Sequence, residues 1–209
     1  MRIIGGKARG RRLQTPSKST AKYSGQHIRP TADRAREALF SILGREVENA
    51  TVLDLYAGTG ALGLEALSRS AERTVFVDYS SKAVQIIKKN IELCGFSDRT
   101  LVFKRDLTKG LSFLLKQLPG TTFSIVFVDP PYRKGLSAGM LQKLAESDLL
   151  CPEALVVVED DAVIELPAQV ADLTLVDQRC YGETAFWLYR KKQLFINLHS
   201  KGEVNGRKQ

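Results

Sequence analysis

Short apolar runs alternate with helical stretches along most of this chain, and this alternation restricts the possible folds more than any other feature. The runs are rich in β-branched and aromatic residues, as buried strands are, and they cover residues 50–56, 74–78, 100–104, 123–128 and 154–159. The stretches between them have apolar residues at helical spacing and cover residues 61–69, 81–94, 107–118 and 136–149. Strands that alternate with helices predict an α/β fold with a parallel, doubly wound sheet.

Further elements are expected on either side of this alternation. Residues 172–179 and 184–190 flank a turn at Gly182 and predict an antiparallel pair at the far edge of the sheet. Upstream, Thr31 is a candidate N-cap for a helix with an apolar stripe. At the N-terminus, residues 2–15 predict two short strands around a glycine-rich turn.

The length of 209 residues fits one α/β domain with a small appendage. We divide the chain into a basic N-terminal hairpin and loop (1–28), the α/β domain (29–190) and a basic polar tail (191–209). No apolar run approaches the roughly 20 residues that cross a bilayer, and the N-terminus has no signal-peptide pattern. Three scattered cysteines and two histidines give no zinc-binding spacing. We therefore expect a cytoplasmic protein without a membrane span or a metal, and no feature demands more than a monomer.

Positive charge is concentrated at the two ends of the chain. Residues 1–36 carry a net charge of +9 and residues 190–209 carry +5, whereas residues 37–189 carry −6. An acidic body with basic ends favours a polyanionic partner, although solvated tails would have the same composition. The candidate contacts to nucleic-acid phosphates are Arg2, Lys7, Arg9, Arg11, Arg12, Arg29, Arg34, Arg36 and Arg133.

The tetrapeptide Asp129-Pro130-Pro131-Tyr132 follows the apolar run over 123–128. It therefore lies at the carboxyl end of an expected strand, where open α/β sheets bind ligands. The two prolines stiffen the turn and remove two N–H donors. An exocyclic base amine would donate to Asp129 and to the Pro130 carbonyl, with its ring stacked on Tyr132. The alternative is an ordinary strand-ending turn, in which Asp and Pro are common.

The pattern Gly58-x-Gly60-x-x-Gly63 follows the strand over 50–56 and matches the dinucleotide-binding fingerprint, with Asp78 twenty residues after Gly58. An NAD-dependent oxidoreductase is therefore one alternative. Asp54 argues against it, because a carboxylate at the end of that strand would repel a pyrophosphate and attract an ammonium group. S-adenosylmethionine carries an ammonium group and no phosphate, so it fits this turn better.

Each part of S-adenosylmethionine has candidate residues at a strand end. Asp54 and the backbone of Ala57, Gly58 and Gly60 are assigned to the methionine end, Asp78 to the ribose hydroxyls, and Asp106 and Leu107 to the adenine amino group and ring. The alternative for Asp78 and Asp106 is a helix N-cap, because each precedes an expected helix. Three acids at three successive strand ends favour the cofactor interpretation.

The segment 54–68 (DLYAGTGALGLEALS), together with Asp129-Pro130-Pro131-Tyr132, resembles class I methyltransferases that act on exocyclic amines. The segments 2–13 (RIIGGKARGRRL) and 29–40 (RPTADRAREALF) narrow the resemblance to the RsmD family of bacterial 16S rRNA guanine-N2 methyltransferases, over residues 1–190. This resemblance implies a Rossmann-like fold with a seven-stranded, mostly parallel sheet. It also implies a guanine of small-subunit rRNA as the target, within an assembling ribosomal subunit.

The expected reaction is direct methyl transfer to a guanine that is extruded from its stack. Asp129 and the Pro130 carbonyl would hold the N2 amine, and Tyr132 would stack on the ring. An adenine-N6 methyltransferase on DNA or RNA is an alternative, because the tetrapeptide recognises an amine and not a particular ring. A nucleic-acid-binding protein without activity is a third possibility.

Overall fold

The computed structural model describes residues 1–16, 30–131 and 135–193. Its helices are α1 (Pro30–Leu43), α2 (Ala61–Ser68), α3 (Ser81–Cys94), α4 (Ser112–Gln117) and α5 (Leu136–Ala145), with short 3-10 turns η2 (Gly44–Val47), η3 (Ser97–Arg99) and η4 (Leu107–Lys109). Its strands are β1 (Thr51–Leu55), β2 (Arg73–Asp78), β3 (Thr100–Lys104), β4 (Phe123–Val128), β5 (Leu150–Asp161), β6 (Gln169–Val170), β7 (Leu173–Tyr181) and β8 (Thr184–Lys191).

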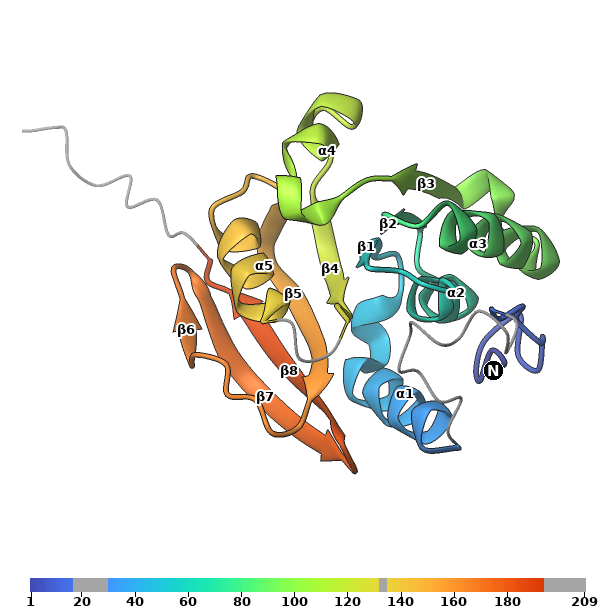
Figure 1. Ribbon diagram of the computed structural model, residues 1–209, viewed down its shortest axis with the longest axis horizontal. Helices are drawn as coiled ribbons and strands as arrows, with labels where there is room; N and C mark the ends of the chain where they lie inside the picture. Colours follow the sequence, from blue (N-terminus) through green and yellow to red (C-terminus); the bar gives the residue numbers. More distant parts are fainter. Residues whose placement is uncertain (17–29, 132–134, 194–209) are drawn as a thin grey trace, which may run out of the picture.

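All of the strands form one sheet with the order β3-β2-β1-β4-β5-β8-β7-β6 (Figure 1). The pairs from β3 to β5 are parallel, and β8, β7 and β6 continue the sheet with antiparallel pairs. The parallel sheet with an antiparallel edge is therefore confirmed. The implied count of seven strands becomes eight, because the two-residue strand β6 pairs with β7 at the edge.

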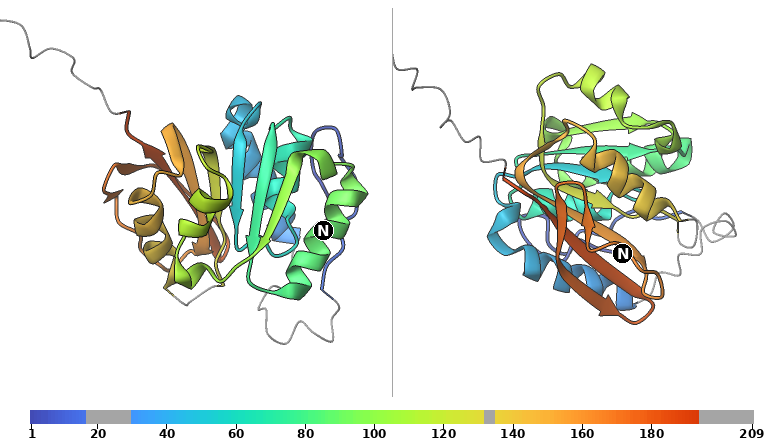
Figure 2. Two further views of the ribbon diagram at one scale, coloured as in Figure 1. Left: turned by 90° about the horizontal axis from the view of Figure 1, so that it is seen from above. Right: turned by 90° about the vertical axis from the view of Figure 1, so that its left-hand side faces the viewer.

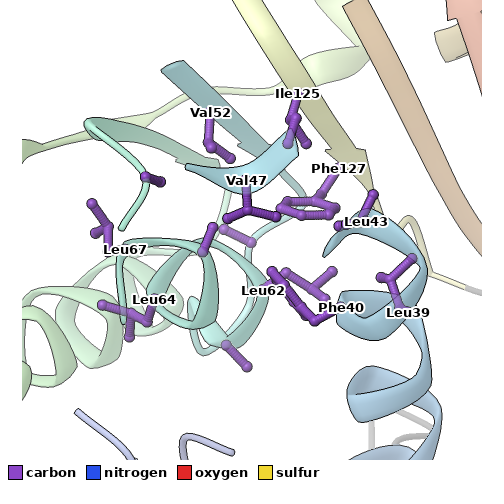
Figure 3. Close-up of a cluster of buried hydrophobic side chains, with 14 of the residues drawn as sticks. Leu39, Phe40, Leu43, Val47, Val52, Leu62, Leu64, Leu67, Ile125 and Phe127 are labelled. Carbon is purple, nitrogen blue, oxygen red and sulfur yellow. The ribbon is translucent and has the colours of Figure 1, made fainter. Parts of the chain in front are cut away.

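Helices cover both faces of the sheet and create two apolar cores (Figure 2). The first core, which lies under α1, α2 and α3, includes side chains from the alternate positions Ile125 and Phe127 of β4. Figure 3 shows Phe127 between α1 and α2, beside Phe40 and Leu43. The second core lies under α4 and α5 and takes the other set of alternate positions, Val126 and Val128. Because both faces of the central strands are buried, their sequences are continuously apolar.

Several expected boundaries are correct and several are shifted. Gly95 ends α3 in the left-handed conformation, as its C-cap position predicts. The expected N-cap at Thr31 is wrong, because α1 begins at Pro30, whose fixed φ suits the first turn of a helix. The helix expected over 107–118 divides into η4 and α4, since Gly110 between them has a φ of 95°. The helix expected over 136–149 ends at Ala145, and β5 then begins at Leu150, earlier than predicted.

The hairpin expected over residues 2–15 is reduced to one antiparallel bridge between Arg2 and Arg12. We call residues 1–16 the N-terminal segment. Three of its backbone N–H groups still bond across the segment, Ile3 N to Arg11 O, Gly10 N to Ile3 O and Leu13 N to Met1 O. Others bond to side chains of α2. Ile4 N and Gly5 N donate to the carboxylate of Glu65, each at 2.8 Å. The segment is therefore docked on the helices and does not stand free as a hairpin.

Within the described ranges, no helix combines the length and the apolar character that crossing a membrane requires.

Candidate active site

The carboxyl ends of β1 and β4 lie side by side where the strand order reverses. The chain runs outward through β1, β2 and β3 and then returns to β4 on the other side of β1. Such a topological switch point is where open α/β sheets bind their ligands. Asp54 lies in β1, and Asp129 follows β4 directly. The two acids singled out from the sequence therefore flank the switch point.

Strand register places the acids on one face of the sheet. Asp54 faces the first core because Leu53 and Leu55, its neighbours, face the second. Asp78 lies two residues after Phe76 of the first core, and Glu159 lies two residues after Val157 of the same core. Val128 pairs with Val158, and the next residues, Asp129 and Glu159, are close enough for the charge of Glu159 to raise the pKa of the Asp129 carboxyl group. The structure thus brings Asp54, Asp78 and Asp129 together, as the sequence predicts, and adds Glu159.

Two of these carboxylates, those of Asp54 and Asp78, accept hydrogen bonds from the glycine turn between β1 and α2. Gly58 and Gly60 have φ angles of 57° and 77°, which favour glycine. Gly58 N donates to Asp78 Oδ2 at 2.9 Å, and Gly63 N in the first turn of α2 donates to Asp54 Oδ2 at 2.9 Å. Ala57 N donates to Val77 O at 3.1 Å, which ties the turn to β2. The predicted glycine turn is therefore present, with its backbone at the switch point, and its contact with a cofactor stays a prediction.

Asp54 is 1% exposed, and burial raises the pKa of its carboxyl group to about 8. The N–H of Gly63 opposes this rise, whereas the negative charges of Asp78 and Glu159 add to it. A buried carboxylate is costly unless a positive group compensates it. Among the described residues, the ionised form of Asp54 would therefore be stabilised by a nearby cation. Contact of Asp54 with a ligand stays a prediction.

Asp78 joins the start of the loop before α3 to the glycine turn. Its Oδ1 accepts from Ser80 N at 2.8 Å and its Oδ2 accepts from Gly58 N at 2.9 Å. Ser80, rather than Asp78, is the N-cap of α3, because its hydroxyl oxygen accepts from Ala83 N. An ionised carboxylate has about four lone-pair directions, so two backbone bonds leave capacity for sugar hydroxyls. The ribose assignment stays a prediction.

Asp106 and Leu107 follow β3. Asp106 is exposed and caps η4, since its Oδ1 accepts from Thr108 N at 3.0 Å and from Thr108 Oγ1 at 2.7 Å. These two bonds lower the pKa of its carboxyl group. Asp106 therefore acts as a helix N-cap, as the alternative interpretation expected. A hydrogen bond from the adenine amino group to Asp106 stays a prediction. Leu107 is 3% exposed and packs in the second core, so the structure assigns its side chain to packing and not to a ring contact.

Asp129 is partly buried beyond the end of β4, and its N–H donates to Leu55 O at 3.4 Å. Burial raises the pKa of its carboxyl group well above the ordinary value, and Glu159, Asp54 and Asp160 raise it further. Pro130 is buried and Pro131 is exposed.

Tyr132 and Arg133, which the sequence predicts for this site, lie outside the described residues.

Two residues of this edge were not predicted from the sequence. Glu159 could have been found, because it is an acid near the end of the strand that neighbours β4. Tyr56 gave no signal, yet it has a φ of 59°, a strained value for a residue with a side chain. Burial and the charge of Asp106 raise the pKa of its hydroxyl group. Tyr56 therefore lies between the β1 end and the β3 end of the site.

The predicted nucleic-acid contacts separate into exposed and buried cations. Those exposed are Arg2, Lys7, Arg9, Arg11 and Arg12 of the N-terminal segment and Arg34 of α1. Arg29 lies outside the described residues. Arg36 is 5% exposed, donates to Arg2 O at 2.6 Å and pairs with Asp33 at 3.0 Å. The prediction that Arg36 contacts RNA is wrong for this conformation, because its guanidinium group joins α1 to the N-terminal segment.

The fold and the site together define a class. A sheet with this strand order, a braced glycine turn after β1 and an Asp-Pro-Pro-Tyr sequence after β4 is the Rossmann-like architecture of class I methyltransferases. Comparison with known proteins narrows the class. The family model described as "Conserved hypothetical protein 95" matches residues 1–190, so the chain belongs to that family, which is the RsmD family.

Relatives and solved structures agree with this assignment. Ribosomal RNA small subunit methyltransferase D of Escherichia coli K12 is 36% identical over 192 residues, which are 92% of this chain and 90% of that protein. The structure of the provisionally assigned methyltransferase yhhF from E. coli is 36% identical, with a TM-score of 0.76 over 92% of this chain and 98% of that chain. An RNA methyltransferase from Salinibacter ruber, solved with S-adenosyl-L-homocysteine, is 17% identical, with a TM-score of 0.57 over 78% of this chain and 94% of that chain; this last likeness concerns the fold.

Proposed function

We propose that the protein transfers a methyl group from S-adenosylmethionine to the exocyclic N2 amine of a guanine in 16S rRNA. The observation that carries the proposal is the row of carboxylates at the switch point, with Asp54 and Asp78 beneath the glycine turn and Asp129 with Glu159 beside it. The first pair suits a cationic nucleoside cofactor, and the second suits a base with hydrogen-bond donors. The name of the E. coli relative supports rRNA methylation as the activity.

The residues at the switch point fit S-adenosylmethionine. Its ammonium and sulfonium groups are positive, and a cation near Asp54 would offset the burial and the negative charges that raise the pKa of this carboxyl group. The glycine turn offers backbone close to the ligand, and Asp78 offers acceptors to the ribose. The cofactor supplies an electrophilic methyl group, and the S. ruber neighbour was solved with the product form of this cofactor.

Asp129 has the role of holding the amine. In the proposed reaction the N2 lone pair forms the new N–C bond, and the electron pair of the breaking C–S bond goes to sulfur, which becomes a neutral thioether. The alkylated nitrogen carries the positive charge and then loses a proton to Asp129 or to water. Because the amine becomes acidic only after alkylation, Asp129 acts mainly by positioning and by electrostatics.

The register of β4 and β5 favours guanine over adenine. Guanine presents two neighbouring donors, N1–H and the N2 amine, on its Watson–Crick edge, whereas adenine presents one amine beside an acceptor. Two carboxylates on adjacent strands, Asp129 and Glu159, match two donors. An adenine would need one of the two acids to be protonated in order to bond its N1 lone pair, so the adenine-N6 alternative fits this row less well.

The test is a strain without the gene, in which methylated guanines of 16S rRNA are mapped by nucleoside mass spectrometry and sequencing. We expect one N2-methylguanine to disappear, to return with the wild-type gene, and to stay absent with Asp129→Asn. Asp148→Asn is the matched control, because Asp148 is exposed and precedes β5 at the opposite edge of the sheet. An unchanged guanine profile, or the loss of an N6-methyladenine, would overturn the assignment.

We also propose that the substrate is an assembling small subunit in the cytoplasm and that the enzyme acts as a monomer. The basic N-terminal segment supports a large, phosphate-rich partner. Methylation assays on free 16S rRNA and on isolated subunit precursors separate the two substrates. Faster methylation of free 16S rRNA than of the precursors would contradict the proposal.

A further inference from the structure

One buried side-chain amide joins the N-terminal segment to the glycine turn. Asn90 of α3 is fully buried. Its Oδ1 accepts from Gln14 N at 2.7 Å, and its Nδ2 donates to Gln14 O at 3.1 Å and to Thr59 O at 2.9 Å. Gln14 belongs to the N-terminal segment, and Thr59 lies between Gly58 and Gly60. A single amide therefore holds both parts of the chain.

The amide of Asn90 has no spare donor for another role. Both of its N–H bonds are used, and both point to backbone carbonyls, while its oxygen faces a backbone N–H. The opposite orientation of the amide would set donor against donor and acceptor against acceptor, so the network fixes the orientation. A buried carbonyl that loses its donor costs free energy. The orientation of the Thr59 peptide thus depends on Asn90.

The N-terminal segment has a second contact with the turn and several with α2. Thr59 Oγ1 lies 3.4 Å from Met1 Sδ, and Ala8 N donates to Ser68 Oγ at 2.9 Å. Figure 2 shows the segment running beside α3, and its bonds to Glu65 and Ser68 place it along α2. The segment therefore meets the glycine turn at Thr59, directly through Met1 and indirectly through Asn90.

We infer that Asn90 is a positioning residue, which couples docking of the N-terminal segment to cofactor binding through the Thr59 carbonyl. The inference rests on the glycine turn being the cofactor site. Docking of the N-terminal segment fixes the orientation of the Thr59 peptide. The backbone that would bind the methionine end of S-adenosylmethionine is thereby formed before the cofactor binds. By thermodynamic linkage, the cofactor stabilises the docked segment in return. Because the segment carries exposed cations such as Arg9 and Arg12, a bound polyanion is coupled to cofactor affinity by the same route.

The first measurement is the dissociation constant of S-adenosylmethionine by calorimetry for the full chain and for Asn90→Ala. We expect five- to tenfold weaker binding in the variant, the effect of about one lost hydrogen bond. The KM for the cofactor should rise by the same factor while kcat stays within about twofold. Gln85→Ala removes an amide from the exposed face of the same helix and should leave both constants unchanged. Equal affinity in a folded Asn90→Ala protein would overturn the coupling.

The second measurement needs no variant, so it holds even if Asn90→Ala fails to fold. Amide hydrogen exchange of the wild-type chain is followed with and without S-adenosylhomocysteine. We expect the cofactor product to slow exchange at Gln14 and at the other segment amides. Bound product with unchanged exchange in residues 3–14 would refute the coupling alone. A wild-type chain that binds neither form of the cofactor would instead refute the proposed function, and the coupling with it.

Discussion

Asp54 combines a raised pKa with a position beneath the glycine turn. In the folded chain its pKa is raised to about 8, whereas an exposed aspartate has a value near 3.8. The folded protein therefore binds a proton that the unfolded chain lacks at pH values between these two. Stability from this group is present at low pH and is lost as pH rises through about 8, by at most ~1.4 kcal/mol per pH unit.

The same carboxyl group should make cofactor binding depend on pH. A cation bound nearby favours the ionised form, so binding at pH 6 requires Asp54 to release its proton. We expect the affinity for S-adenosylmethionine to increase from pH 6 to pH 7.5, by up to about tenfold per pH unit. Calorimetry at several pH values measures this slope. In Asp54→Asn the slope should become shallower, and a slope that the substitution leaves unchanged would remove Asp54 from the effect.

Sequence reasoning named acids for the candidate site from their place at strand ends, and their contacts with ligands stay predictions. Asp54, Asp78 and Asp129 are such residues, and the structure brings them together. Arg36 was misassigned because a sequence does not show in which direction a helical side chain points. Asn90 was not found, since a buried amide within an amphipathic helix gives no pattern of its own.

At the scale of elements, the buried strands were predicted best. β3 and β4 match their expected bounds, because continuous β-branched and aromatic runs are typical of strands buried on both faces. The ends of helices were predicted less well, since capping and tertiary packing decide them. The N-terminal hairpin is present only in part, with one bridge between Arg2 and Arg12, because Glu65 and Ser68 accept hydrogen bonds from other N–H groups of the segment.

The contact between α2 and β2 depends on a glycine. A Cβ at Gly63 would lie 2.4 Å from a ring carbon of Phe76 and 2.7 Å from Thr74 Cγ2. We expect Gly63→Ala to destabilise the protein by about 1–3 kcal/mol, because both neighbours are buried and cannot yield freely. Urea denaturation measures the change in the free energy of unfolding.

Gly139→Ala is the matched control for this prediction. Gly139 lies in α5, and a Cβ there meets no atom within 4 Å. Alanine should therefore be neutral or stabilising by up to about 1 kcal/mol, because it is the better helix former. If both substitutions had the same effect, close packing at Gly63 would not be the reason for its glycine.

At the scale of the whole molecule, the positive charge of the N-terminal segment is separated from the acidic candidate site. The acidic residues of the candidate site lie at the carboxyl edge of the sheet, and the exposed cations belong to the N-terminal segment, which is docked on α2 and α3. The sequence predicted this division from net charge alone. It did not predict that the segment would be docked, because docking depends on side chains of α2 and α3 that are distant in the sequence.

The exposed cations of the segment should make RNA binding sensitive to salt. Replacing Arg9 and Arg12 with alanine should lower RNA affinity and reduce the slope of log affinity against log salt by about two units, one for each phosphate contact. Arg11 is left in place because it donates to Leu93 O. Replacing Arg45 and Arg73, which are exposed near the opposite edge of the sheet, is the control. Equal slopes in the two double variants would mean that the segment does not touch the RNA backbone.

The most direct test of the account is a crystal structure with S-adenosylhomocysteine bound. We predict the amino acid end of the ligand on the backbone of residues 57–60, its ribose hydroxyls on Asp78, and its sulfur directed toward Asp129. A ligand bound elsewhere on the molecule, with Asp78 and the glycine turn unoccupied, would contradict the assignment of the active site.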